Sequence, residues 1–223
     1  MSNRNIKISE GEYYHIYSRG VDKRDIFLDR DDYERFMKLL FVANGSNSFV
    51  FRELPTSSVY KKFDRGEPLS SIGAYCLMPN HFHILIKETK ENGISMFLRK
   101  LLTSYSSYFN KKYNRTGGLF GGNYKARHAD NDEYLKYLFS YISLNPVKII
   151  DADWKENGIK DRESSKKYLK NYRYSSYQDY IGVKRDEGKS LNVIDFPEYF
   201  SNPKEFDDFI NEWLVFNDVK NDT

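Results

Sequence analysis

Two apolar segments separated by only two residues constrain the fold of this chain more than any other feature. They span residues 72–78 and 81–87, with Pro79 and Asn80 between them. Apolar runs of this length, broken by proline and asparagine, are typical of two antiparallel strands joined by a tight turn. The sequence therefore predicts a β-hairpin around which the rest of the fold must be built.

The second of these segments has two distinct faces, because side chains alternate across a strand. Phe82, Ile84 and Ile86 would point to one face, into a core beneath helices. His81 and His83 would both point to the other face. The chain has only four histidines, so the presence of two on one strand face marks a candidate site.

The remaining elements follow from the spacing of apolar residues. Residues 13–18 and 124–129 have the composition of strands, and residues 31–43, 92–113 and 132–145 have apolar residues at helical spacing. The order is strand, helix, two strands, helix, strand, helix. It predicts an α+β fold in which an antiparallel sheet carries helices on one face.

The chain length of 223 residues allows one domain with an addition. We expect a core domain over residues 1–148, with an insertion at 45–70 that contains a strand at 49–53. Residues 149–223 would be a charge-rich, mostly helical C-terminal extension, ending in a helix that starts at Pro203 and runs to about residue 217. The patterns leave the role of this extension open.

The cysteine content and the length of the apolar runs indicate in which compartment the protein would lie and whether it would enter a membrane. Cys76 is the only cysteine, so no disulfide can form within the chain, which suits a reducing cytoplasm. No apolar segment follows the first five residues, and no apolar run approaches the roughly 20 residues that a membrane helix needs. We therefore expect a cytoplasmic protein that does not enter a membrane.

His81 and His83 are a candidate metal-ligand pair, because both imidazoles would lie on one strand face. The same arrangement would serve for contacts to phosphate oxygens, or for two surface histidines without a function. Cys76 lies near them in the predicted hairpin and adds a zinc site as another alternative.

Tyr141 and Asn145 lie four residues apart in the predicted helix 132–145 and therefore share one face. An amide oxygen can complete the coordination of a hard metal ion, and a phenol beside it can act as a nucleophile. Tyr137 lies one turn earlier, which leaves a two-tyrosine arrangement open. The alternative is structural, since helix tyrosines commonly pack and an asparagine before Pro146 also marks the end of a helix.

A basic stretch from residue 92 to residue 129 contains no Asp or Glu. Aromatic residues are interleaved with its basic residues, a combination typical of surfaces that bind single-stranded or hairpin DNA. A solvated helix face with ordinary core aromatics is the alternative. The candidate DNA-binding residues are Arg99, Lys100, Lys111, Lys112, Arg115, Lys125 and Arg127.

Four segments together resemble the REP-associated tyrosine transposases, members of the single-tyrosine HUH transposase group. They are residues 14–20 (YHIYSRG), 76–85 (CLMPNHFHIL), 118–125 (GLFGGNYK) and 141–148 (YISLNPVK). Residues 174–177 (YSSY) resemble the C-terminal signature of the family, and the resemblance runs from about residue 12 to residue 181. The Met-Pro-Asn-His-x-His and Tyr-x-x-x-Asn-Pro motifs are specific when they occur together in this order.

The resemblance implies a ferredoxin-like β-α-β-β-α-β core and an HUH transposase catalytic domain over residues 1–148. By motif, His81 and His83 would bind Mg²⁺ or Mn²⁺ with Asn145 as the third ligand, and Tyr141 would be the nucleophile. The substrate would be single-stranded DNA beside a hairpin formed by palindromic repeats, cleaved through a 5′-phosphotyrosine intermediate. The protein would act as a monomer or a homodimer.

Two other functions stand as alternatives. One is a domesticated protein that binds hairpin DNA without cleaving it, and metal-dependent formation of a covalent adduct would separate it from a transposase. The other is a replication-initiator type of nicking protein, which rests on the pairing of Tyr137 with Tyr141.

Overall fold

A computed structural model describes residues 6–55 and 58–215 of the chain. Its central feature is a four-stranded sheet in the order β2-β3-β1-β4, in which all neighbours are antiparallel. The strands are β1 (Tyr13–Arg19), β2 (Ser71–Met78), β3 (His81–Lys87) and β4 (Lys125–His128). The predicted hairpin is confirmed, since Met78 pairs with His81 across the turn.

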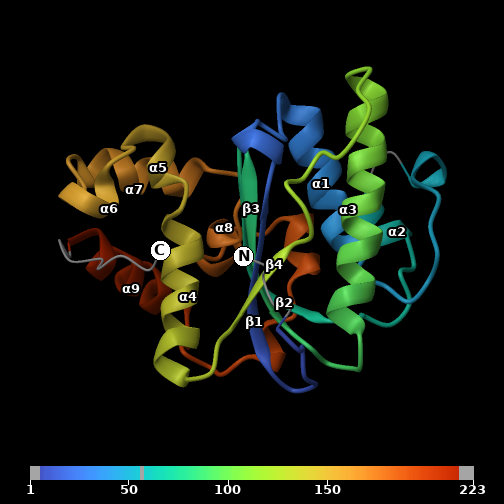
Figure 1. Cartoon of the computed structure of the whole chain (residues 1–223). Helices are drawn as coiled ribbons and strands as arrows, with labels where there is room; N and C mark the ends of the chain where they lie inside the picture. The colour runs from blue at the N-terminus through green and yellow to red at the C-terminus, as the bar shows by residue number, and fades with distance from the viewer. Residues whose placement is uncertain (1–5, 56–57, 216–223) are drawn as a thin grey trace.

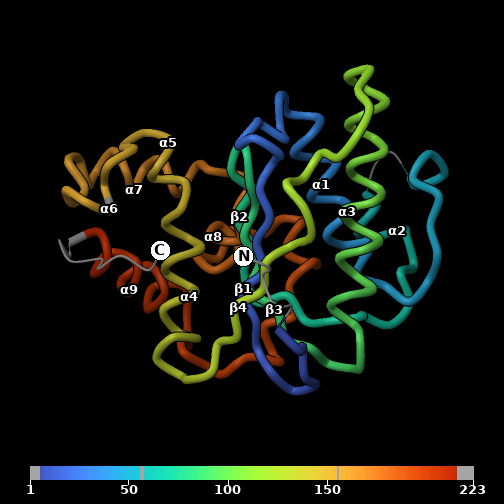
Figure 2. Tube along the Cα trace, viewed as in Figure 1, coloured from blue at the N-terminus to red at the C-terminus, as the bar shows by residue number. Residues whose placement is uncertain are grey.

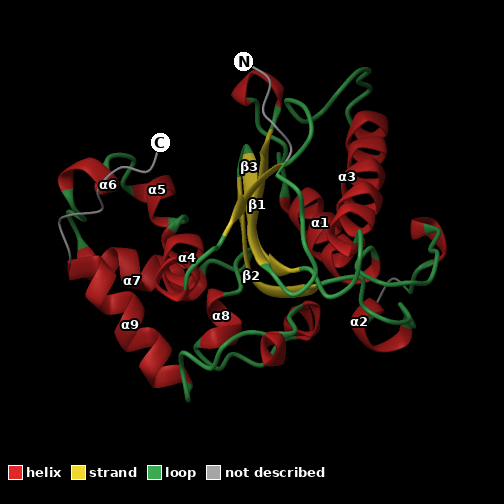
Figure 3. Cartoon of the chain, turned by 60° about the horizontal axis from the view of Figure 1, so that its bottom comes forward, coloured by secondary structure: helices red, strands yellow, loops and turns green. Residues whose placement is uncertain are grey.

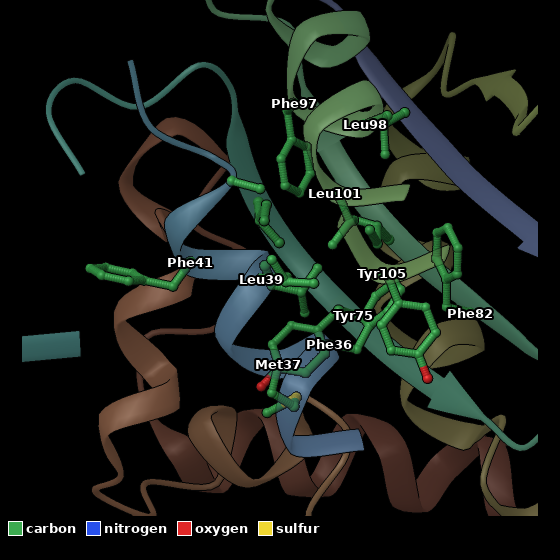
Figure 4. Packing of buried hydrophobic residues seen from close by; sticks show 14 of the residues in the cluster. Phe36, Met37, Leu39, Phe41, Tyr75, Phe82, Phe97, Leu98, Leu101 and Tyr105 are labelled. Atoms are coloured by element: carbon green, nitrogen blue, oxygen red, sulfur yellow. The ribbon is translucent and has the colours of Figure 1, made fainter. Parts of the chain in front are cut away.

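Two helices cover one face of the sheet. They are α1 (Arg30–Val42) and α3 (Gly93–Lys112), and both lie on the same side of the strands (Figure 1). Phe82, Ile84 and Ile86 point to this face and are fully buried, as the alternation predicts. Figure 4 shows the aromatic and aliphatic side chains of α1 and α3 packing against Tyr75 and Phe82 of the sheet. The β-α-β-β-α-β core predicted from the sequence, with its helices on one face, is therefore confirmed.

The opposite face of the sheet is covered by α4 (Asp132–Leu144), which follows the core in sequence. The side chain of Asn131 accepts a hydrogen bond from the backbone N–H of Tyr134, which caps the helix at its start. The apolar side chains of α4 pack against Ala74, Cys76 and Leu85, which are buried on this face of the sheet. Figure 3 shows the sheet between the two helical layers.

The C-terminal extension packs beside α4 and around the outer edge of β2. Its helical segments are α5 (Val147–Ile150), α6 (Trp154–Asn157), α7 (Arg162–Asn171), α8 (Tyr177–Tyr180), η3 (Asp186–Ser190), η4 (Val193–Asp195) and α9 (Pro203–Val215). Figure 2 shows α9 running alongside α4. The backbone of Leu77 donates to Tyr174, and the backbone of Ser176 donates to Tyr75. The exposed edge of β2 is thus closed by hydrogen bonds.

The last helix begins at Pro203 as expected, while residues 216–217, where it was expected to end, lie outside the described residues. Residues 1–5, which bear on the expected absence of a leader segment, also lie outside the described residues. No helix in residues 6–55 and 58–215 has both the length and the apolar character required to span a bilayer.

The strand predicted at 49–53 is wrong. The insertion instead contains a short 3₁₀ helix, η2 (Phe51–Glu53), and a single helical turn, α2 (Val59–Lys62). The Arg35 guanidinium lies 3.4 Å from the centre of the Phe51 ring, so Phe51 packs on α1 rather than entering a sheet. The insertion lies on the α1 and α3 side of the molecule, away from α4 (Figure 2).

Candidate active site

A cleft of about 1010 Å³ opens between α4 and the sheet. Its walls come from β1, the β2–β3 turn, β3, β4 and α4, together with the short 3₁₀ helix η1 (Val21–Lys23). The cleft brings together six of the predicted nucleophile, metal-ligand and DNA-binding residues, although they are distributed over 65 positions of the chain. They are His81, His83, Lys125, Arg127, Tyr141 and Asn145.

His83 reaches the cleft because it alternates with the buried residues of β3. Tyr17 of β1 is its partner in the register, so both side chains lie on the α4 face. The His83 ring is almost completely buried, and its Nδ1 lies 2.8 Å from Nε2 of His15. The two rings are stacked with their centres 5.0 Å apart. His83 is therefore held by a second histidine on the neighbouring strand.

His81 lies at the start of β3, directly after the turn. Its Nδ1 lies 2.6 Å from Oδ1 of Asn80, and its ring is nearly perpendicular to that of His83 at a centre-to-centre distance of 5.0 Å. The two imidazoles therefore share one side of the cleft, as strand alternation predicts.

Tyr141 projects from α4 onto these imidazoles. The centre of its ring lies 5.5 Å from that of His83 and 5.6 Å from that of His15, in edge-to-face contacts. Burial raises the pKa of the Tyr141 hydroxyl above its ordinary value, and nearby Tyr17 adds to this while Arg19 opposes it. The phenol is consequently held in its neutral form near neutral pH.

Asn145 forms the end of α4 and is buried beside the cleft. Its Nδ2 donates to the backbone carbonyl of Tyr141 at 2.8 Å. This bond fixes the orientation of the amide, so Oδ1 is the atom with which Asn145 would ligate a cation. The residue that ends the helix is therefore also the one whose amide oxygen the sequence marks as a candidate ligand.

Tyr137 also lines the cleft, one turn before Tyr141. Its ring centre lies 5.8 Å from that of Tyr141 and 5.2 Å from that of Trp213 on α9. Tyr137 therefore bridges α4 to the C-terminal extension, whereas the ring of Tyr141 packs on the histidines.

The donor set fits a hard divalent cation. Two imidazoles whose Nδ1 atoms face neighbouring side chains would ligate through Nε2, and the Asn145 amide would add an oxygen. In the described part of the chain, no group of three or more His, Cys, Asp or Glu side chains is arranged for a metal ion. Cys76 is fully buried, and burial raises the pKa of its thiol far above the usual range, so the geometry gives the zinc alternative no support.

The two basic residues of β4 line the cleft. Lys125 lies opposite Tyr17 in the register and Arg127 opposite His15, so both belong to the histidine-bearing face. Both side chains are exposed. The Arg127 guanidinium lies 4.5 Å from the centre of the Tyr134 ring, which places it between β4 and α4.

The other five predicted DNA-binding residues lie on or just after α3, on the opposite side of the sheet, and none of the five lines the cleft. Lys100 donates to the backbone carbonyls of Gly45 and Asn47, and Lys112 forms ion pairs with Asp29 and Asp32. Arg115 lies over the ring of Phe109. Arg99 and Lys111 are exposed. The basic stretch is continuous in sequence but is divided between two faces in space.

Among the cleft residues that the sequence did not mark as candidates are three that contact a cleft histidine or act on Tyr141. His15 and Arg19 come from β1, and Asn80 comes from the turn. The period-two alternation of β1 was the available signal, because it places His15, Tyr17 and Arg19 on one face. Which face meets His83 depends on the pairing of β1 with β3, and this pairing is not visible in local sequence.

Comparison with known proteins gives two matches. Residues 67–145 match the family model described as "Transposase IS200 like". A solved structure of a REP-associated tyrosine transposase bound to a REP hairpin has a similar fold, with a TM-score of 0.53 and 14% sequence identity over 88% of this chain and 96% of that chain. No curated protein matches the sequence. The matched segment 67–145 contains β2, β3, α3, β4 and α4, and hence most of the cleft.

Proposed function

Since residues 67–145 carry the IS200-like transposase pattern and the chain has the fold of a REP-associated tyrosine transposase, we propose that it is a single-tyrosine DNA strand transferase. Its substrate would be single-stranded DNA next to a hairpin. The observation that carries this proposal is the packing of the Tyr141 ring against His83 and His15, with Asn145 one turn away in the same cleft. This packing supports a nucleophile and a cation site that would lie within one turn of helix of each other.

In this reaction the Tyr141 oxygen attacks the phosphorus of the scissile phosphodiester and forms a 5′-phosphotyrosine, while the leaving strand departs with a 3′-hydroxyl. Mg²⁺ or Mn²⁺, when bound by His81, His83 and Asn145, would supply charge stabilisation at a non-bridging phosphate oxygen. The covalent bond retains the energy of the phosphodiester, so a second 3′-hydroxyl can reverse the step onto a new strand.

Basic side chains of the cleft would assist this reaction in two ways, by acting on the Tyr141 hydroxyl and by holding the DNA strand. Arg19 lowers the pKa of the Tyr141 hydroxyl against the effect of burial, and Arg127 acts in the same direction. Both arginines therefore favour the tyrosinate that must form on attack. Lys125 and Arg127 would also hold the backbone of the single strand along β4.

The second candidate function is a hairpin-DNA binder that does not cleave. The raised pKa of Tyr141 favours this alternative, because a neutral phenol is a weak nucleophile. The two candidates make opposite predictions about covalent chemistry, although they share the same DNA partner.

The test uses the full chain with Mn²⁺ and a single-stranded oligonucleotide that carries a palindromic hairpin. The strand is labelled on the 3′ side of the cleavage point, so that a 5′-phosphotyrosine leaves the label on the protein in a denaturing gel. We expect labelling by the wild type, none by Tyr141→Phe, and labelling by Tyr137→Phe as the matched control. Full labelling of Tyr141→Phe would exclude Tyr141 as the nucleophile, and hairpin binding without labelling of the wild type would establish the non-cleaving alternative.

A further inference from the structure

The Nδ1 atoms of both cleft imidazoles face a neighbouring side chain. Asn80 approaches His81 at 2.6 Å, and His15 approaches His83 at 2.8 Å. A neutral imidazole carries its one proton on either Nδ1 or Nε2, and only the nitrogen without the proton can accept a bond or ligate a metal. The partner of each Nδ1 therefore decides what each Nε2 can do.

The arrangement around His81 determines its tautomer. Asn80 donates from Nδ2 to the backbone carbonyl of Lys23 at 3.0 Å, so the amide carbonyl Oδ1 is the end that faces His81. Oδ1 can only accept, which requires a proton on Nδ1 of His81. The turn is itself held in place, since the carbonyl of Pro79 accepts from the backbone of both Ile26 and Phe27.

The Nδ1 atom of His83 also faces a neighbouring side chain, but that side chain is His15, which can either donate or accept. His15 and His83 lie on adjacent central strands and are only 6% and 5% exposed, so water does not compete effectively for the bond between them. Tyr141 contacts both rings edge-on and restricts their rotation. If His15 accepts, His83 carries its proton on Nδ1; if His15 donates, the proton of His83 lies on Nε2 and that nitrogen cannot ligate.

We propose that His15 is a positioning residue that accepts from His83, so that both histidines of the cleft are held with the proton on Nδ1. His15 then does for His83 what Asn80 does for His81. The metal-binding consequence rests on the proposed function, whereas the tautomer itself is a property of the protein without metal or DNA. An acceptor that receives the second N–H of a ligating histidine fixes the tautomer and the orientation of that ring.

The first test is nitrogen NMR of the metal-free protein, labelled with ¹⁵N in its histidines, at a pH where the imidazoles are neutral. Only four histidines contribute, so single variants assign every signal. We expect His81 and His83 to show a protonated Nδ1 and an unprotonated Nε2. In His15→Leu, we expect His83 to move toward the form protonated on Nε2. A wild-type His83 that is protonated on Nε2 would overturn the proposal.

The second test is the affinity for Mn²⁺, measured by calorimetry on the full chain without DNA. We expect His15→Leu to weaken binding by about 10- to 100-fold, and His15→Gln, whose amide oxygen can still accept, to recover most of the loss. His128→Leu is the matched control, because His128 pairs with Glu12 and lies outside the residues that line the cleft. Equal loss in the Leu and Gln variants would mean that His15 only fills space, and would overturn the proposal.

The two tests separate this inference from the proposed function. If the wild type shows the expected tautomers but forms no covalent adduct with DNA, the strand-transfer proposal fails while the role of His15 stands. If adduct formation depends on Tyr141 but His83 has the other tautomer, the strand-transfer proposal stands and the role of His15 fails.

Discussion

Individual lysines of the basic stretch differ in what they contact. Lys125 lines the cleft on the exposed face of β4, whereas Lys112 bridges the carboxylates of Asp29 and Asp32 at 2.7 and 2.8 Å. Asp32 is fully buried, and the hydroxyls of Tyr108 and Tyr113 also donate to it. Equal charge in the sequence thus corresponds to different physical roles.

Substitution of these lysines should separate DNA binding from stability. We expect Lys125→Gln to weaken hairpin-DNA binding and to reduce the slope of log affinity against log salt by about one, as the loss of one phosphate contact requires. Lys112→Gln should leave that slope unchanged and lower the free energy of unfolding by about 1–3 kcal/mol, because a buried carboxylate loses a partner. Fluorescence anisotropy across a salt series and urea unfolding measure the two effects. An unchanged slope in Lys125→Gln would remove β4 from the DNA site.

At the scale of elements, the start of α1 combines a helix cap with an ion pair. Asp29 accepts from the backbone N–H of Asp32 and also accepts from Lys112 of α3. The hydrogen bond from Lys112 is the largest influence on the Asp29 carboxyl and holds its pKa below the ordinary value. The two helices on this face of the sheet are therefore joined by a charge contact at one end.

The pH dependence of this contact follows from the direction of the shift. A carboxyl with a lowered folded-state pKa contributes stability above its unfolded pKa of about 3.9, and this contribution is lost as the pH falls through the lower folded value. Asp29→Asn keeps the capping oxygen and removes the charge. We expect it to cost under about 1 kcal/mol at neutral pH, because the side chain is half exposed. Urea unfolding of both proteins should show this difference disappearing in acid, and a constant difference at all pH values would contradict it.

The elements themselves were largely accessible from the sequence. The β2–β3 hairpin, α1, α3 and α4 all lie where apolar spacing places them, and Asn131 and Asn145 bound α4 as polar end residues do. The exception is the segment 49–53, which has strand composition. Strand formation needs an adjacent sheet edge, and this segment instead lies on α1, where the ring of Phe51 packs against the Arg35 guanidinium.

At the scale of the whole molecule, a buried ion pair within the C-terminal extension includes an arginine that also contacts the sheet. Arg185 pairs with Asp179 at 2.5 Å, and both side chains are about a tenth exposed. Arg185 also donates to the Tyr75 hydroxyl on β2 and to the carbonyl of Ser175 at the strand edge. The Arg185 guanidinium therefore links the segment that closes the sheet edge to β2, in addition to the backbone hydrogen bonds there.

Removing this guanidinium should destabilise the molecule as a unit. We expect Arg185→Met to lower the free energy of unfolding by about 3–5 kcal/mol, because Asp179 is left buried without its partner. Arg173→Met, which removes a more exposed pair with Glu187, should cost about 1 kcal/mol or less. Both tryptophans, Trp154 and Trp213, lie in the extension, so fluorescence follows it while circular dichroism follows the whole chain. Coincident urea transitions are expected, and an earlier fluorescence transition in the wild type would show that the extension unfolds separately.

Local sequence determined the identity of the elements and the two halves of the site. Strand alternation places His81 and His83 on one face, and helical spacing places Tyr141 one turn from Asn145, because both patterns depend on backbone geometry alone. Tertiary structure decided how these halves meet. The pairing of β1 with β3 brings His15 to His83, and the packing of α4 on the face opposite α3 brings Tyr141 to both histidines while leaving most of the basic stretch on the far side. These outcomes depend on contacts between residues distant in the chain, which no local pattern encodes.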